Sequence, residues 1–171
     1  MAADPQQRAI ERSRRRVRRA LAMAGFSGWT MAFFGALSLL TSWGSLTALL
    51  IGALLVLCAW NELHGRRELR AMNPGAPVAL SRNQVFIALG ICGYCVICVM
   101  QPAAFDPELR AVLAQAGMER DAERLFDLAA RITRAVYCFV IAATLLVQVG
   151  TGLFYLSRVK DVARLRRAEA M

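Results

Sequence analysis

The sequence contains very little histidine and lysine. His64 is the only histidine, and Lys160 is the only lysine among 21 basic residues. Haem ligation by paired histidines inside a membrane is therefore excluded, and His64 with nearby Glu62 offers fewer ligands than a zinc-type site requires. We expect no metal and no cofactor. We expect His64 to lie in a loop that faces solvent or lipid headgroups.

Charged residues and histidine are also absent from four long apolar blocks. The blocks cover about residues 21–42, 46–60, 85–100 and 135–156. The chain is 57% hydrophobic, whereas an ordinary soluble domain has roughly 45–50%. A helix needs roughly 20 apolar residues to cross a bilayer. The pattern predicts an all-α, integral membrane four-helix bundle, with residues 1–171 forming a single domain.

The absence of charge inside the blocks argues against proton-coupled transport, which needs an ionisable group at depth. The fourth block carries Gln148 near its middle. An amide in hydrocarbon is costly unless it is hydrogen-bonded, so Gln148 should face another helix. We expect an intramembrane polar contact within the bundle, with contact to a second protein or a ligand as the alternative. An uncoupled pore or carrier would need a polar path that Gln148 alone hardly supplies.

Basic residues are distributed unevenly among the segments between the blocks. Sixteen lie before the first block, between the second and third, or after the fourth, and five lie between the third and fourth. The positive-inside rule therefore predicts that both termini are cytoplasmic and that residues 101–134 lie outside. The near-exclusive use of arginine is typical of GC-rich bacterial genomes. We therefore expect a multi-pass protein of the bacterial inner membrane.

The N-terminal region carries a dense run of arginines. Asp4 and Pro5 are typical of a helix start, and no breaker separates them from the first block. We expect one long helix with a basic cytoplasmic extension. Because the arginines flank membrane blocks, they should attract anionic headgroups rather than nucleic acid, with a specific partner site as the alternative. The expected headgroup-binding residues are Arg14, Arg15, Arg16, Arg18, Arg19, Arg66 and Arg67.

Two polar segments connect the later blocks. Between the second and third blocks, the sequence NPGAP predicts a turn, and Ser81 or Asn83 would cap the third helix. Between the third and fourth blocks, residues 103–134 are expected to form a short outer-side helical segment. Within it, a second helix begins at about Glu119 and continues into the fourth block.

Aromatic and small residues indicate how the spans sit and pack. Trp60 and Tyr155 should lie in an aromatic belt at the inner interface, where amphipathic rings are stable. Small residues at four-residue spacing should let the first two helices approach closely. These small residues are Gly28, Ala32 and Ala36 in the first block and Ala48 and Gly52 in the second.

All five cysteines lie in the blocks, three of them in the stretch ICGYCVICVM. On a helix, Cys92, Cys95 and Cys98 share one broad face and climb about 4.5 Å per step. A straight helix cannot wrap a metal cluster, and Cys58 and Cys138 lie at other depths. The default interpretation is apolar packing, because a free cysteine behaves as a small hydrophobic residue.

The spacing C-x-x-C is also that of thiol–disulfide exchange sites. With four spans, CVIC resembles the vitamin K epoxide reductase and membrane disulfide-generating oxidoreductase families, which pass electrons from such a pair to a quinone. The resemblance implies Cys95 and Cys98 as a redox pair. Those families place the pair on a different span and use a second cysteine pair in an outer loop, whereas residues 101–134 contain no cysteine. A disulfide between Cys98 and Cys138 is a further alternative.

These patterns together predict a non-enzymatic small polytopic membrane protein. It would be an accessory or structural subunit of a larger membrane assembly, or a lipid-organising protein. Its expected partners are membrane lipids with anionic headgroups and other membrane protein subunits, not nucleic acid. The alternative function is a membrane thiol-disulfide or quinone-linked oxidoreductase that uses Cys95 and Cys98.

Overall fold

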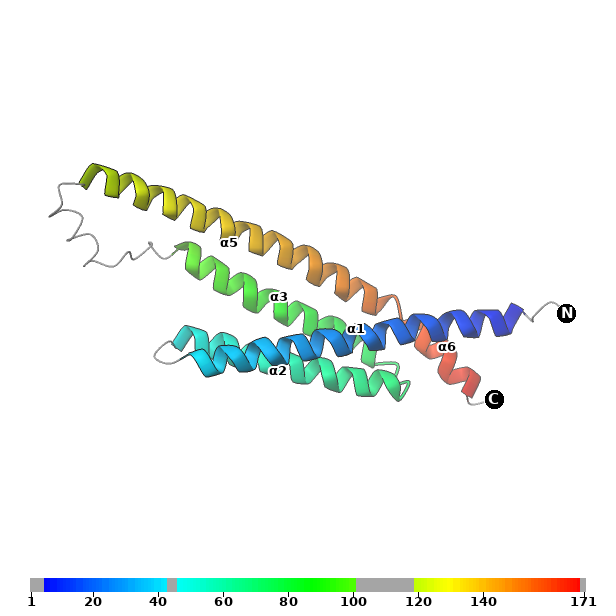
Figure 1. The fold of residues 1–171 in the computed structure, drawn as a ribbon. Coiled ribbons are helices and arrows are strands. Elements are labelled where there is room, and N and C mark those ends of the chain that lie inside the picture. Colours follow the sequence, from blue (N-terminus) through cyan, green and yellow to red (C-terminus); the bar gives the residue numbers. More distant parts are fainter. Residues whose placement is uncertain (1–4, 43–45, 101–118, 170–171) are drawn as a thin grey trace. The chain divides into compact units, whose positions relative to one another are not determined.

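The computed structural model describes residues 5–42, 46–100 and 119–169 (Figure 1). This part of the chain is helical and contains no strand. Its helices are α1 (Pro5–Thr41), α2 (Leu46–Arg70), α3 (Ala76–Met100), α5 (Glu119–Leu156) and α6 (Val159–Glu169). Four helices, α1, α2, α3 and α5, are long and apolar enough to cross a membrane. The expected cap at Asp4 and the expected short helix before Glu119 lie outside the described residues.

The helices extend well beyond the apolar blocks. The helix α1 passes without interruption from the arginine-rich stretch into the first block. The helix α2 continues through the polar segment after the second block as far as Arg70. His64 therefore lies on a helix, whereas the sequence predicted that it lies in a loop. The helix α5 begins at Glu119, as the sequence predicted.

The turn between α2 and α3 shows that the helix cap predicted at Ser81 or Asn83 is wrong. Met72 has a positive φ of 53°, and the backbone bonds Met72 N–H to Leu69 O and Asn73 N–H to Glu68 O close the end of α2. This is the bond pattern of a Schellman motif. The helix α3 then starts at Ala76, so Ser81 and Asn83 lie inside it and are buried, and neither caps it.

Contacts divide the chain into two compact units. The first unit comprises residues 1–90 and 146–171, and thus contains α1, α2, the first part of α3, the end of α5 and α6. The second unit comprises residues 91–145, the remainder of α3 and most of α5.

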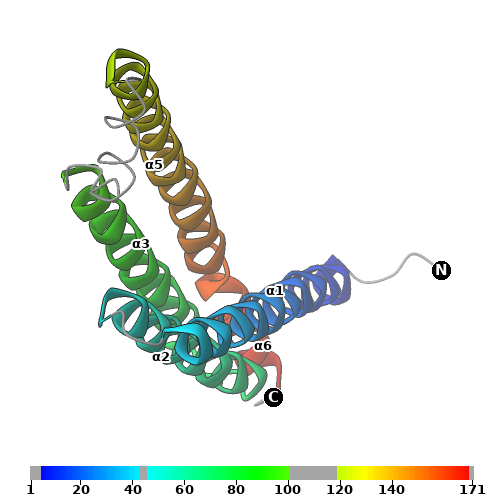
Figure 2. The same cartoon turned by 60° about the vertical axis from the view of Figure 1, so that its left-hand side comes forward.

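In the first unit, α1 and α2 lie side by side and antiparallel (Figure 1; Figure 2). Glycines bring the two helices together: a Cβ on Gly35 would lie 3.0 Å from the backbone N of Val56 and 3.1 Å from the carbonyl O of Gly52. Gly28 similarly faces Leu63. The predicted contact at Gly28 is therefore present, whereas Ala36 is exposed and Gly35 makes the close approach instead.

The packed core of the first unit lies where α1, the α2–α3 turn, the end of α5 and α6 meet. The short helix α6 buries Val162 and Leu165 on one face. Further along α1 and α2, large apolar side chains are exposed, as expected for helices that face lipid. The buried core residues are Val17, Ala20, Ala24, Leu69, Ala76, Leu80, Tyr155, Val162 and Leu165.

In the second unit, α3 and α5 contact each other through aromatic side chains. The rings of Tyr94 and Tyr137 meet edge to face with their centroids 6.4 Å apart, an arrangement favoured by the ring quadrupoles. Asp127 and Arg131 form an exposed ion pair of 2.8 Å on α5. Such exposed pairs contribute little to stability, so apolar and aromatic contact dominates here.

Candidate functional site

The carboxyl group of Glu62 is fully buried between three helices. The Tyr155 hydroxyl donates a 2.6 Å hydrogen bond to its Oε1, and the Asn83 amide donates a 2.7 Å bond to its Oε2. The Gln84 amide lies 3.1 Å from Oε1 and 3.0 Å from Oε2. Asn83 and Gln84 belong to α3 and Tyr155 to α5, so this one carboxyl group joins α2, α3 and the end of α5.

All the donors to Glu62 are neutral, and no cation pairs with it in the described part of the chain. A buried polar group is costly unless it is hydrogen-bonded. The side chain of Glu62 meets that requirement through donors from two other helices. The arrangement therefore acts as a polar lock, which holds only while all three helices are in register.

The hydrogen bonds also fix the orientation of the Asn83 amide. Its Nδ2 donates to Glu62 and, at 2.9 Å, to the carbonyl O of Cys58. Both partners are acceptors, so the amide nitrogen must face them and Oδ1 must point away. That Oδ1 is enclosed and accepts no hydrogen bond from the described residues.

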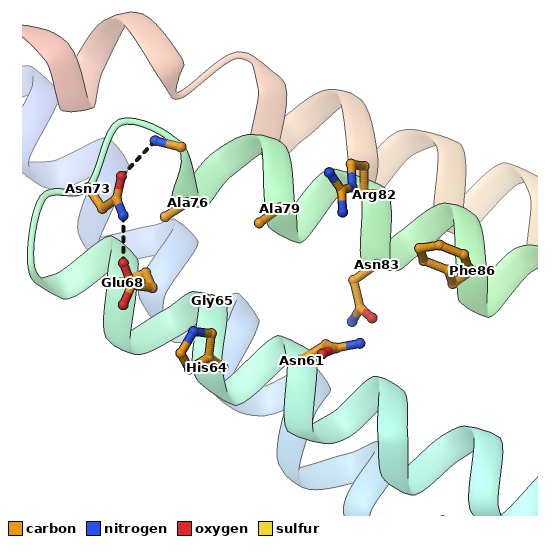
Figure 3. Close-up of a pocket in the computed structure, with 11 residues that line it drawn as sticks. Asn61, His64, Gly65, Glu68, Asn73, Ala76, Ala79, Arg82, Asn83 and Phe86 are labelled. Atoms are coloured by element: carbon orange, nitrogen blue, oxygen red, sulfur yellow. Dashed lines mark hydrogen bonds between the residues drawn. The ribbon is translucent and has the colours of Figure 1, made fainter.

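Next to this lock, a cavity of about 390 Å³ with a mixed polar and apolar lining opens between α2 and α3 (Figure 3). Asn73 closes one end, since its Nδ2 donates a 2.6 Å bond to Glu68 and its Oδ1 accepts from the Gly75 N–H. Side chains of both charges, Glu68 and Arg82, contribute to the lining. The cavity can therefore hold water or a small polar group by hydrogen bonding.

A second buried cluster joins α1 to α6. Asp161 is 4% exposed, and its Oδ1 accepts a 2.9 Å hydrogen bond from the Ser13 hydroxyl. Arg16 lies 3.7 Å from Oδ1 and Arg158 lies 3.5 Å from Oδ2. The Arg158 guanidinium also stacks 4.5 Å from the ring centroid of Phe154. This cluster fixes α6 across the basic half of α1.

The arginines expected to meet lipid headgroups fall into three environments. Arg14, Arg15, Arg18, Arg19 and Arg67 are exposed. The side chain of Arg16 is 56% exposed but pairs with Asp161. Arg66 is half-buried and passes over Gly25 of α1.

Gln148, expected to make a contact inside the bundle, lies on α5 and is half-buried. Its Oε1 is enclosed, and none of the described residues donates a hydrogen bond to it. A hydrogen bond to this oxygen from another helix, which the sequence led us to expect, is thus absent among the described residues.

Each of the five cysteines, all within the described part of the chain, is free. Cys95 is buried on α3, Cys98 is partly exposed one turn later, and Cys138 on α5 is exposed. The described residues also contain no group of three or more His, Cys, Asp or Glu side chains that could hold a metal ion. The burial of Cys58 and Cys95 at 2% exposure is typical of apolar packing.

Sequence reasoning placed Glu62 in a polar loop and Tyr155 in an interfacial belt. The structure corrects both, because Tyr155 is fully buried and its hydroxyl faces Glu62. The available signal was that Asn83 and Gln84 precede the third block while Glu62 follows the second. Antiparallel neighbouring helices bring those two ends to the same level.

No family model matches this chain, and comparisons with curated proteins and with solved structures return no match. Among the described residues, buried polar groups such as Glu62 and Asp161 join helices, and exposed arginines line the polar half of α1.

Proposed function

We propose that this chain is a non-enzymatic, multi-pass protein of the bacterial inner membrane that binds anionic lipid headgroups and organises lipid around its basic end. In this proposal both termini are cytoplasmic, and the basic half of α1 continues from the membrane-spanning half through the headgroup layer. Association with other membrane protein subunits is a companion hypothesis, which co-purification in mild detergent would test.

One observation carries the proposal. Asp161 already has Ser13, Arg16 and Arg158 as partners, whereas Arg14, Arg15, Arg18 and Arg19 are exposed on the same half of α1. Directly beyond them on the same helix, the first apolar block begins. A row of exposed guanidinium groups beside a membrane-length apolar helix is well placed to contact phosphate groups.

The magnitude of the effect is sufficient for lipid selection. A basic side chain near an anionic membrane surface contributes about 1 kcal/mol. Guanidinium groups also bind phosphate oxygens through two parallel N–H bonds, which lysine cannot do. Several such residues together would enrich anionic lipid around the protein even at ordinary ionic strength.

The test measures lipid enrichment around the full chain in vesicles that contain phosphatidylglycerol and phosphatidylcholine. Replacing Arg18 and Arg19 by glutamine should lower the enrichment of phosphatidylglycerol by roughly tenfold to thirtyfold. The matched control replaces Arg8 and Arg12, two exposed arginines of α1, with the same change in charge. They lie about 14–20 Å before the apolar block, at about 1.5 Å per residue, and should lower the enrichment much less. Equal enrichment in all three proteins, or no enrichment in any, would contradict the proposal.

A further inference from the structure

An aromatic groove runs along the exposed surface of α1 in the first unit. Its volume is about 650 Å³, and Phe26, Trp29, Phe33 and Phe34 contribute its apolar lining. Phe26 is 76% exposed and Trp29 is 66% exposed, so nothing in the described chain covers these rings. Phe33 and Phe34 pack edge to face with their centroids 5.4 Å apart, which makes a continuous apolar surface.

At one end of this groove lies a single basic group, the guanidinium of Arg66 on the neighbouring helix α2. It reaches α1 directly over Gly25, where an added Cβ would lie only 2.8 Å from the guanidinium carbon. Glycine is therefore the residue that leaves room for it. The Nε of Arg66 is enclosed and has no hydrogen-bond partner among the described residues.

The distance along α1 from Gly25, which lies under Arg66, to the far end of the groove at Phe34 matches the thickness of the hydrocarbon part of one lipid leaflet. Gly25 and Phe34 are separated by about 14 Å along α1, at about 1.5 Å per residue. Half of a hydrocarbon core about 30 Å thick is about 15 Å. Arg66 lies beyond Trp60, at the polar end of α2, while the rings lie inside the first apolar block.

We propose that this groove binds one anionic phospholipid, with its phosphate on Arg66 and an acyl chain along Phe26, Trp29 and Phe33. The inference rests on the proposed binding of anionic lipid and names a defined site for it. The outer N–H groups of the Arg66 guanidinium can bind phosphate oxygens. A zwitterionic headgroup would bring its own cation close to this guanidinium, so the net charge of the lipid decides the preference. The aromatic lining then excludes water from one side of the chain, so charge and shape select the same molecule.

A phospholipid fits these observations better than the other occupants of an apolar groove. Free phosphate would use Arg66 and leave the exposed rings uncovered. A partner helix or a second copy would cover the rings but needs an anionic group placed at Arg66. The phospholipid supplies the negative charge at one end and the apolar chain along the rest of the groove.

The experiment measures quenching of Trp29 fluorescence by lipids brominated on the acyl chain. The full chain carries Trp43→Phe and Trp60→Phe, so that Trp29 is the only tryptophan, and is reconstituted with brominated phosphatidylglycerol or brominated phosphatidylcholine. Phosphatidylglycerol should quench Trp29 preferentially. Arg66→Gln should reduce that preference by about tenfold, as expected for the loss of a charge-assisted hydrogen bond.

Two further variants distinguish binding at Arg66 from general attraction of anionic lipid by the positive charge of the protein. Arg70→Gln removes the same charge about one turn further along α2, on an exposed side chain outside the groove, and should keep the preference within about twofold. Gly25→Ala keeps the charge but displaces the guanidinium, since its Cβ would occupy that space. It should weaken the preference without removing the positive charge.

Three results would overturn the inference. Equal losses in Arg66→Gln and Arg70→Gln would show a diffuse charge effect. Overall enrichment of phosphatidylglycerol would then persist, and the proposed function would stand. A second protein with Trp29→Phe and Trp43→Phe keeps Trp60 as its only tryptophan. Quenching of Trp60 in that protein, without quenching of Trp29 in the Trp29-only protein, would show that a partner helix or second copy covers the groove. No enrichment of phosphatidylglycerol in any variant would contradict both the site and the proposed function.

Discussion

The Tyr155 hydroxyl donates a 2.6 Å hydrogen bond to Glu62 Oε1, although 93 positions separate the two residues in sequence. Both side chains are fully buried. This bond ties the polar end of α2 to the end of α5, while Asn83 and Gln84 bring in α3. The polar end of the first unit is thus held by a directional contact as well as by apolar packing.

Removing the Tyr155 hydroxyl should destabilise the protein. In Tyr155→Phe, the buried Oε1 of Glu62 loses its shortest hydrogen bond, which should lower the free energy of unfolding by about 1–3 kcal/mol. Thermal unfolding in detergent measures the change. A double-mutant cycle with Glu62→Leu should give a coupling energy of at least about 0.5 kcal/mol, and strictly additive effects would show that the two groups do not interact.

Substitution at Gly35 should separate α1 from α2. A Cβ there would meet backbone atoms of Val56 and Gly52, which cannot rotate away, so Gly35→Ala should cost about 1–3 kcal/mol. Gly93→Ala is the matched control, because nothing lies within 4 Å of its added Cβ and alanine favours helix. Similar unfolding curves for both variants would contradict the close approach at Gly35.

Loss of the Asp161 carboxylate should release α6 from α1. In Asp161→Ala, the Ser13 hydroxyl loses its acceptor and Arg16 and Arg158 lose their shared anion. Amide hydrogen exchange should therefore speed up along α6, because its docking contacts maintain its protection. Glu169→Ala, an exposed acid on the same helix, should leave the exchange unchanged. Faster exchange in both variants, or in neither, would show that the buried cluster does not hold α6.

Thiol labelling tests the alternative redox function. If Cys95 and Cys98 serve as apolar packing, the extent of labelling in the full chain should be the same with and without prior reduction. Cys95→Ala and Cys98→Ala should then leave the protein folded, since each removes only a small apolar group. A fraction of Cys95 and Cys98 that becomes reactive only after reduction would favour the oxidoreductase and count against the non-enzymatic proposal.

The sequence predicted the structure best where the physical cause is local. Runs of apolar residues of membrane-spanning length require internally bonded backbone, and four such helices are present. The start of α5 at Glu119 follows equally local signals. The helix cap predicted at Ser81 or Asn83 was wrong, because a polar side chain at the end of an apolar block is suited both to a helix end and to a buried contact.

The sequence by itself determined that this protein is helical, that four helices are apolar enough to cross a membrane, and where most apolar cores lie, because backbone hydrogen bonding in lipid leaves little choice. Only the tertiary structure decided that Glu62 is buried with Tyr155, that Gly35 rather than Ala36 meets α2, and that Arg66 ends an aromatic groove on α1. Those outcomes depend on which helix faces meet, and a local pattern of residues carries no measure of that pairing.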